Sequence, residues 1–508
     1  MDFTRITTLG ELKRTGYKSK PIKDELRDNL IKFLKKNENP FKGIIGYEET
    51  VIPDIQTAIL SRHNIILLGL RGQAKTKIAR MLINLLDEYI PVVAGSDLND
   101  DPFNPLSKYS KDLITENGDD TKIEWHHRSD RYAEKLATPD VSVADLIGDV
   151  DPIKAASLKL PYSDERVIHF GLIPRSHRSI FVINELPDLQ ARIQVALFNI
   201  LQESDIQIRG FKVRLPLDIQ FVFTANPEDY TNRGSIVTPL KDRIDSQILT
   251  HYPKTISISQ EITQQESKFT EDQKKKVNIN QLLKDLVEQI AFEARGSEYI
   301  DHKSGVSARL TISAYENLIS TAERRMIINN EDCTHLRISD LYGVIPAITG
   351  KIELVYEGEQ EGPAKVAHIL ISKAIRSLFD QYFPSPDKAK KTPQELSAKN
   401  VNPYSAITNW FNKGNVVDVL NTISDKEYEK TLSNVPGLKE VVKKYQPGIN
   451  GKDNLLMMEF VLNGLAEYSM LSKFRLENGL QFKDMMSSMF TKFSDEEDED
   501  LNDSEFYS

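Results

Sequence analysis

The fold of this chain is decided by the stretch Asn64-Ile65-Ile66-Leu67-Leu68-Gly69-Leu70-Arg71-Gly72-Gln73-Ala74-Lys75-Thr76. Its run of four aliphatic residues predicts a short buried strand that ends at Gly69. From Lys77 to Leu86 the apolar side chains recur at helical spacing, which predicts a helix with one buried face. A strand, a glycine-containing loop, Lys-Thr and a helix together match the phosphate-binding pattern G-x-x-x-x-G-K-[ST], with one change.

This pattern predicts which atoms would hold a phosphate. The backbone N–H groups of the loop and the positive end of the following helix favour the β- and γ-phosphates of a nucleotide. Lys75 adds a point charge, and the Thr76 hydroxyl can ligate Mg²⁺. The change is Ala74, which stands where the pattern has its second glycine. Its methyl group is tolerable if φ is negative there and costly if the loop needs a positive φ.

Length and composition indicate a folded protein of several domains. The 508 residues allow about three domains, and 40% hydrophobic with 28% charged residues is typical of globular proteins. No apolar run approaches the roughly 18–20 residues that span a bilayer. Met1 to Lys36 is charged throughout without an apolar signal core, and the single cysteine, Cys333, excludes an intramolecular disulfide. We therefore expect a cytoplasmic protein.

The net charge of −10 is concentrated at one end of the chain. Asp495 to Ser508 carries eight acidic residues and no basic ones, so the rest of the chain is near −2. This balance gives no overall basic signal for nucleic-acid binding. We expect the acidic tail to be disordered and solvated.

The stretch from Ser179 to Glu185 is a second apolar strand, and it ends in an amide and a carboxylate. In a P-loop ATPase such a strand lies beside the P-loop strand and presents an Asp to the hydrated metal and a Glu to the attacking water. Here Glu185 is present, but Asn184 replaces the Asp. An amide oxygen accepts from metal-bound water without adding a negative charge, so we expect a lower affinity for Mg²⁺.

Two more strands and a loop complete the predictions for this half of the chain. Gln220 to Ala225 is a buried strand that ends at Asn226, whose amide either orients a water or caps the turn before proline. Tyr89 to Val93 is another candidate strand. The loop that contains Ile45 and Gly46 precedes the P-loop strand, and it either covers an adenine ring or is an ordinary connection.

Two arginines are candidates for contacts with the γ-phosphate. Arg243 is placed to reach a phosphate bound by a neighbouring subunit, and the alternative is a surface ion pair with Asp242 or Asp245. Arg309 lies in the first turn of a predicted helix, where it either leans onto the phosphates or is solvated.

As a set these motifs resemble the AAA+ ATPases, and within them the magnesium chelatase I-subunit and MoxR-like group. The resemblance covers roughly residues 40–350. It is carried, in the order of that family, by Gly69 to Thr76, Phe181 to Glu185, Thr224 to Glu228, Leu240 to Arg243 and Ser307 to Arg309. Two segments look like insertions of that group, namely Asp140 to Ala156 and the predicted hairpin around Gly210.

The resemblance implies roles for particular residues. Asn184 and Glu185 match the metal and base pair, Asn226 the first sensor, Arg243 the arginine finger and Arg309 the second sensor. The cofactors implied are ATP and Mg²⁺, with Thr76 and Asn184 as metal ligands. The cofactor-binding set is Ile45, Gly46, Gly69, Leu70, Arg71, Gly72, Gln73, Ala74, Lys75, Thr76 and Lys77.

The resemblance also implies an architecture and an assembly. It predicts an α/β AAA+ P-loop core with a doubly wound five-stranded parallel sheet, a helical lid and a mostly helical C-terminal extension. It implies a ring, commonly a hexamer, and a partner with a von Willebrand factor A domain. The predicted divisions are 1–40 for an N-terminal helical segment, 41–255 for the core, 256–385 for the lid, 386–494 for the extension and 495–508 for the tail.

Three functions remain open at this point. The first is an ATP-hydrolysing remodeller or chaperone of a partner protein. The second, motivated by Ala74 and Asn184, is a nucleotide-gated scaffold with weak or no hydrolysis. The third and lowest is a nucleic-acid motor or transcriptional activator, which would use the basic residues of the predicted hairpin.

Overall fold

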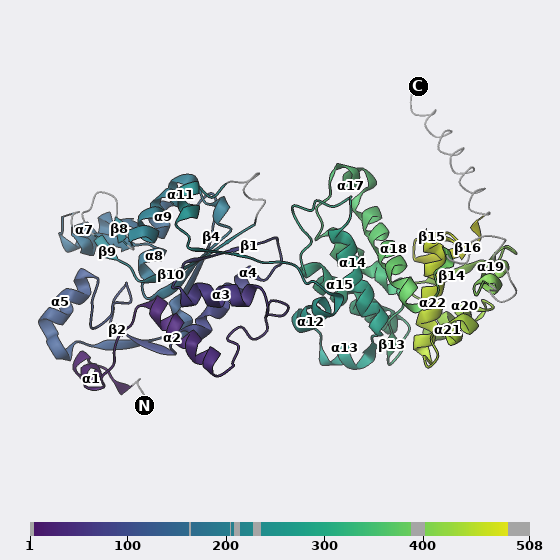
Figure 1. The fold of residues 1–508 in the computed structure, drawn as a ribbon, viewed down its shortest axis with the longest axis horizontal. Helices are drawn as coiled ribbons and strands as arrows, with labels where there is room; N and C mark the ends of the chain where they lie inside the picture. Colours follow the sequence, from purple (N-terminus) through teal and green to yellow (C-terminus); the bar gives the residue numbers. More distant parts are fainter. Residues whose placement is uncertain are drawn as a thin grey trace, which may run out of the picture. The chain divides into compact units, whose positions relative to one another are not determined.

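The computed structural model describes residues 5–161, 164–203, 205–207, 214–226, 235–387 and 402–485. The chain divides into two compact units, Met1–Tyr252 and Pro253–Ser508, whose elements are labelled in Figure 1. The described helices of the first unit are α1 (Leu9–Arg14), α2 (Ile22–Lys35), α3 (Val51–Leu60), α4 (Lys75–Met81), α5 (Lys108–Asn117), α6 (Val143–Leu146), α7 (Pro152–Leu158), α8 (Leu172–Arg175), α9 (Ala191–Glu203) and α11 (Thr238–Asp242). Its described strands are β1 (Ile65–Leu68), β2 (Tyr89–Val93), β3 (Ile123–His127), β4 (Tyr132–Leu136), β5 (Gly148–Val150), β6 (Ile168–Phe170), β7 (Ser179–Asn184), β8 (Asp205–Gln207), β9 (Arg214–Pro216), β10 (Ile219–Ala225) and β11 (Ser246–Leu249).

Five strands of the first unit form a parallel sheet in the order β11-β1-β10-β7-β4. The aliphatic run that opens the P-loop pattern is β1, and it is buried at every position. It pairs with β10 on one side and β11 on the other, so Leu68 lies opposite both Ala225 and Leu249. The predicted fold class is confirmed at the level of architecture: an α/β core with a five-stranded parallel sheet that contains the P-loop strand, followed by mostly helical segments.

Helices cover both faces of this sheet, as Figure 1 shows. Successive side chains of a strand point to opposite faces. Ile65 and Leu67 accordingly pack in the cluster formed with α2, α3 and α4, whereas Ile66 and Leu68 pack in the cluster that includes α9 and α11. Two covered faces explain why β1 is apolar without alternation.

One sequence prediction about the sheet was wrong. The strand that ends near Glu185, β7, does not lie beside the P-loop strand, because β10 lies between them. All seven residues of β10 are buried, so it needs a strand on either side, whereas the half-exposed β4 takes the edge. The predicted strand Tyr89–Val93 exists, but it pairs with β3 in an antiparallel ribbon outside the main sheet.

Two insertions predicted from the resemblance are partly described. Residues 140–156 hold α6, β5 and α7, and β5 pairs with β6. The predicted hairpin is present as the antiparallel pair β8 and β9, and its tip around Gly210 lies outside the described residues.

The N-terminal helix α2 is fixed to the first unit by a buried ion pair. Both Glu25 oxygens accept from the Arg131 guanidinium at 2.7 Å, and these side chains are 5% and 1% exposed. Arg131 also donates to the Arg178 carbonyl oxygen at 2.8 Å, and Glu25 accepts from the backbone N–H of Asp87 at 2.7 Å. Such a bidentate pair with satisfied neighbours fixes the position of α2 on the sheet.

The second unit is mostly helical. Its described helices are α12 (Ile256–Glu266), α13 (Glu271–Lys276), α14 (Gln281–Arg295), α15 (Arg309–Ile328), α16 (Ile345–Thr349), α17 (Tyr356–Glu361), α18 (Pro363–Tyr382), α19 (Ser405–Phe411), α20 (Asp425–Ser433), α21 (Leu438–Tyr445) and α22 (Lys452–Glu467). Its described strands are β12 (Val277–Asn278), β13 (Thr334–His335), β14 (Val417–Leu420), β15 (Ser472–Leu476) and β16 (Gly479–Lys483). None of the helices in the described ranges combines the length and apolar character that a membrane crossing needs.

One hydrophobic cluster runs from Val277 to Phe482, so the segments predicted as lid and extension share a core. Within it Glu459 of α22 accepts from the backbone N–H groups of Ile338 and Ser339 at 2.8 and 2.9 Å, and from the Tyr428 hydroxyl at 2.6 Å. Burial raises the pKa of Glu459. This carboxyl therefore joins the C-terminal segment to the 3₁₀ helix Ile338–Val344.

We expect Glu25→Ala to lower the free energy of unfolding of the first unit by about 3–5 kcal/mol, because it leaves the Arg131 guanidinium buried without its partner. The matched control is Asp24→Ala, whose exposed pair with Arg62 should be worth about 1 kcal/mol or less. Urea unfolding followed by fluorescence in a Trp410→Phe background would report on Trp125 of the first unit. A loss below about 1 kcal/mol for Glu25→Ala would contradict this role.

Asp218 predicts a pH dependence of stability. Its carboxylate accepts from the Ile22 N–H at 2.8 Å, and burial raises its pKa to about 6. The folded state therefore binds a proton on the Asp218 carboxyl more tightly than the unfolded state does. The protonated carboxyl contributes its full stabilisation below about pH 4, and this contribution is lost as the pH rises through 6. We compare the unfolding free energy of Asp218→Asn with that of the wild type at two pH values. The difference, variant minus wild type, should be larger at pH 7.5 than at pH 4.5 by roughly 2–3 kcal/mol. The exposed Asp54→Asn, measured identically, should show no such difference.

Candidate functional site

Lys75, the first residue of α4, is only 7% exposed. Its ammonium group donates to the side-chain oxygen of Asn226 at 2.7 Å, to the Leu70 carbonyl oxygen at 3.0 Å and to the Gly69 carbonyl oxygen. A buried ammonium needs such partners to offset its desolvation. The positive charge of the P-loop is therefore held against the end of β10.

Asn226 connects this charge to the end of β7. Its amide nitrogen donates to a carboxylate oxygen of Glu185 at 3.0 Å. The carboxyl ends of parallel strands lie at the same edge of a sheet, which brings together residues more than a hundred positions apart. Lys75, Asn226 and Glu185, three residues that the sequence predicted for one site, thus form one hydrogen-bonded chain.

Sequence reasoning missed Thr224, which supports the same edge. Its hydroxyl accepts from the Glu185 N–H at 3.1 Å and donates to the side-chain oxygen of Asn184 at 3.2 Å. Glu185 has φ 55° and ψ 51°, a left-handed conformation that costs a residue with a side chain of order 1–3 kcal/mol. A buried threonine in a strand gives no signal of this role, because only the pairing of β10 with β7 brings it there.

Thr250 and Tyr47 support the P-loop from behind, and sequence reasoning missed these two residues as well. The Thr250 hydroxyl contacts the Leu68 carbonyl oxygen at 3.2 Å and the Gln73 side-chain oxygen at 2.7 Å. A Cβ on Gly69 would lie 1.9 Å from that hydroxyl oxygen, so this position needs glycine. The Tyr47 hydroxyl donates to the His251 carbonyl oxygen at 2.7 Å and also lies 3.1 Å from the Gln73 carbonyl oxygen. Burial raises the pKa of Tyr47 to about 12, which keeps the hydroxyl protonated.

The conformation at Ala74 answers the question that the sequence left open. Ala74 has φ 58° and ψ 15°, and Gly72 has φ 73°. The loop needs a positive φ at both positions, so the methyl group of Ala74 is strained. A left-handed conformation costs a residue with a Cβ roughly 1–2 kcal/mol.

The remaining predicted cofactor-binding residues surround this loop. Leu70 and Thr76 are half-buried, and Arg71 is exposed at the turn. Lys77 of α4 donates to the Gly43 carbonyl oxygen at 3.0 Å, which brings the segment with Ile45 and Gly46 against the helix. The fold thus places this segment beside the P-loop.

The two predicted arginines are not part of the hydrogen-bonded chain. In the described part of the chain, the recorded contacts of Arg243 are with Gln202 at 3.0 Å, with the Pro239 carbonyl oxygen at 2.7 Å and with the Phe198 ring at 5.2 Å. These contacts hold Arg243 on the surface formed by α9 and α11. Arg309 begins α15 in the second unit, and its side chain is exposed.

The oxygen atoms at this edge fit a magnesium ion that arrives with phosphates. Mg²⁺ prefers oxygen ligands and is usually held by one or two protein groups together with substrate phosphates. Within the described ranges there is no group of three or more His, Cys, Asp or Glu residues that would form a cage. Thr76 and Asn184 each offer one side-chain oxygen, and the Glu185 carboxylate follows Asn184 in the chain. So few oxygens suit a metal that is held mainly by phosphates.

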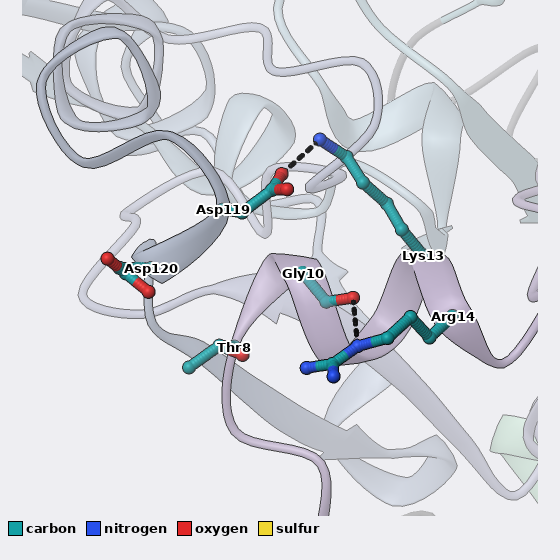
Figure 2. A pocket seen from close by; sticks show the side chains of 6 residues that line it. All are labelled: Thr8, Gly10, Lys13, Arg14, Asp119 and Asp120. Atoms are coloured by element: carbon teal, nitrogen blue, oxygen red, sulfur yellow. Dashed lines mark hydrogen bonds and ion pairs between the residues drawn. The ribbon is translucent and has the colours of Figure 1, made fainter.

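A hollow of about 330 Å³ lies between α1 and the chain near Asp119, away from the P-loop residues, as Figure 2 shows. Lys13 pairs with Asp119 at 2.5 Å across it. The Arg14 guanidinium donates to the Gly10 carbonyl oxygen at 3.3 Å. Mixed charges that already pair with one another, at half-exposed positions, indicate a surface contact of α1 more than a ligand site.

Comparisons with known proteins give distant likenesses. No protein-family model matches the chain. A candidate ATPase from Cytophaga hutchinsonii is 18% identical, with 72% of this chain and 98% of that chain covered and a TM-score of 0.29. A model of the BchI–BchD complex of magnesium chelatase is also 18% identical, with 63% and 98% covered and a TM-score of 0.33. NtrX from Brucella abortus in complex with ATP is 12% identical, with 70% and 68% covered and a TM-score of 0.34. Likenesses at these scores do not establish a role for this chain.

We expect Ala74→Gly to raise the free energy of unfolding of the first unit by about 1 kcal/mol, because glycine adopts the positive φ without strain. The matched control is Ala79→Gly in the interior of the same helix, which should lower it by about 1 kcal/mol or more. Urea unfolding would measure both changes. Equal effects of the two substitutions would show that the loop is not strained at Ala74.

Proposed function

We propose that this protein binds ATP with Mg²⁺ at the edge formed by the P-loop, β10 and β7, and hydrolyses it. The observation that carries the proposal is the hydrogen-bonded chain from Lys75 through Asn226 to Glu185. The Lys75 ammonium and the Glu185 carboxylate are joined through the single Asn226 amide, which supports their proposed roles as the cation for phosphate oxygens and the base. Phosphoryl transfer needs mainly these two elements, charge stabilisation and an oriented water.

Each residue has a part in this chemistry. Lys75 exchanges one of its protein acceptors for β- and γ-phosphate oxygens. Asn226, which the approaching phosphate separates from Lys75, orients the attacking water with its amide. Glu185 accepts a proton from that water through its carboxylate. Thr76 and Asn184 would hold Mg²⁺, which would supply neutralisation of phosphate charge when bound.

The proposal extends to an assembly. Arg243 follows α11, and its guanidinium contacts Gln202 and the Phe198 ring of α9. We propose that it reaches the γ-phosphate of a neighbouring copy in a ring, with Arg309 as a second contact to the phosphates. A protein with a von Willebrand factor A domain is the proposed partner, and the resemblance of the motifs is its only support.

A nucleotide-gated scaffold is the alternative, favoured by two observations. The strained methyl group of Ala74 lies in the P-loop, and Asn184 lacks the negative charge that holds a hydrated metal. Both features lower the hydrolysis rate more than they alter nucleotide binding. Ligand-dependent assembly without phosphate release above background would select this alternative.

We expect Glu185→Gln to reduce Mg²⁺-dependent phosphate release by about a hundredfold or more while nucleotide binding survives, because the base is lost and its shape is kept. Arg243→Ala should reduce turnover similarly, and its effect should depend on assembly. The matched control is Glu134→Gln on the neighbouring strand β4, where an exposed pair with Arg80 is lost and turnover should not change. Phosphate release and particle size would be measured together. Wild-type turnover in both Glu185→Gln and Arg243→Ala would refute the assigned roles.

A further inference from the structure

The second unit contains a hollow of about 240 Å³ among α12, α13, α14 and α15, which are labelled in Figure 1. Sites for whole small molecules usually measure about 300–1,000 Å³, so this hollow suits one or two side chains. Its wall is mostly apolar and includes Phe269, Val277, Ile279, Tyr315 and Ile319. Three of these side chains belong to the buried core of the unit, which fixes the shape of the wall.

Two lysine side chains line the same hollow. Lys284 of α14 is half-buried, and among the described residues its ammonium group has no ion pair or hydrogen bond. Lys274 of α13 pairs with Glu271 at 2.9 Å, and both side chains of this pair are exposed. Such a pair is worth about 1 kcal/mol or less, so another carboxylate can replace Glu271. An apolar wall with two ammonium groups favours a ligand that carries a carboxylate beside a hydrophobic side chain.

The acidic tail, Asp495 to Ser508, contains this combination of groups. It lies outside the described residues, and its sequence has eight acidic residues and no basic ones. Its apolar residues are Leu501 and the adjacent pair Phe506-Tyr507, which follows Glu505. Segments that are acidic only to remain solvated are poor in aromatic residues. The aromatic pair beside a carboxylate therefore calls for a function other than solvation.

The chain between Met485 and the aromatic pair is long enough to reach the hollow. Phe506 lies 21 positions after Met485, and an extended chain of this length spans roughly 70–75 Å. The second unit runs from Pro253 to Ser508, and a compact domain of that size has a radius of gyration of about 18 Å. The aromatic pair can therefore reach across a body of this size.

We propose that the Phe506-Tyr507 pair of the acidic tail occupies this hollow of its own chain, with the Glu505 carboxylate paired to Lys284. The rings cover the apolar wall, and the carboxylate supplies the acceptor that the Lys284 ammonium group lacks. The tether gives the tail an effective concentration on the order of 1 mM at the hollow. A segment that binds only weakly as a separate peptide therefore still fills it. Occupation needs no nucleotide, so the inference is independent of the proposed ATPase activity.

The test is fluorescence anisotropy with a fluorescein-labelled peptide of the sequence Asp495 to Ser508, titrated with the full-length protein. The double variant Phe506→Ala/Tyr507→Ala frees the hollow, so it should bind the peptide about tenfold or more tightly than the wild type does. The matched control Asn502→Ala/Ser504→Ala keeps the aromatic pair and should bind like the wild type. Equal binding by the wild type and the Phe506→Ala/Tyr507→Ala variant, or binding by neither, would overturn the proposal.

Variants of the lysines, made in the Phe506→Ala/Tyr507→Ala background, test the ion pair. Lys284→Met keeps the length of the side chain and removes its charge, and it should weaken peptide binding about fivefold or more. Lys284→Arg should retain the affinity. The matched control is Lys275→Met, because Lys275 of α13 is exposed and does not line the hollow. Thermal unfolding of each variant separates a folding defect from a binding defect. Equal losses in Lys284→Met and Lys275→Met would contradict the proposed pairing.

A photocrosslink identifies the occupant directly. With p-benzoylphenylalanine in place of Tyr507, we expect mass spectrometry to find crosslinks to residues 264–284 and 315–319. The experiment uses a mixture of ¹⁵N-labelled and unlabelled full-length protein, and the crosslinks should join segments of one copy. Crosslinks between labelled and unlabelled copies would assign the hollow to the tail of a second copy and overturn the proposal. Crosslinks confined to other residues would refute the site.

Discussion

The hydrogen bonds that join Lys75, Asn226 and Glu185 are the interaction on which the site depends. They form because β1, β10 and β7 are consecutive parallel strands of the sheet, so the carboxyl ends of all three lie at the same edge. A buried ammonium is stable only with such acceptors, and the acceptors are placed by the sheet. The apolar covering of both faces, in turn, keeps the sheet rigid enough to hold Lys75 of α4 at hydrogen-bond distance from a side chain that follows β10.

Conformational strain lies beside this chain of hydrogen bonds. Ala74 and Glu185 both have a positive φ, which residues with a Cβ adopt at a cost. Their neighbours hold them there. The Thr224 hydroxyl accepts a hydrogen bond from the Glu185 N–H. The Thr250 hydroxyl contacts the side-chain oxygen of Gln73, and the Tyr47 hydroxyl contacts its carbonyl oxygen. Strain held in place by packed hydrogen bonds is common where a backbone must present groups to a ligand.

Much of the core could be predicted from periodicity, and the exceptions have physical causes. The continuous aliphatic runs of β1, β7 and β10 identified buried strands, because parallel strands covered on both faces leave no other pattern. The edge strand Tyr132–Leu136 escaped prediction, since its half-exposed residues carry no such run. Tyr89–Val93 does have a strand-like pattern, but pattern alone does not choose a partner, and it pairs outside the main sheet.

The sequence by itself determined the local chemistry: a strand, a turn with Lys75 and Thr76 after it, and strands that end in Glu185 and Asn226. These follow from residue type and spacing, which act over a few positions. Only the tertiary structure decided that β10 separates the other two strands, that Thr224 and Thr250 support the loop and the strand ends, and that Ala74 has a positive φ. These features depend on contacts between segments far apart in the chain, and no local pattern records such contacts.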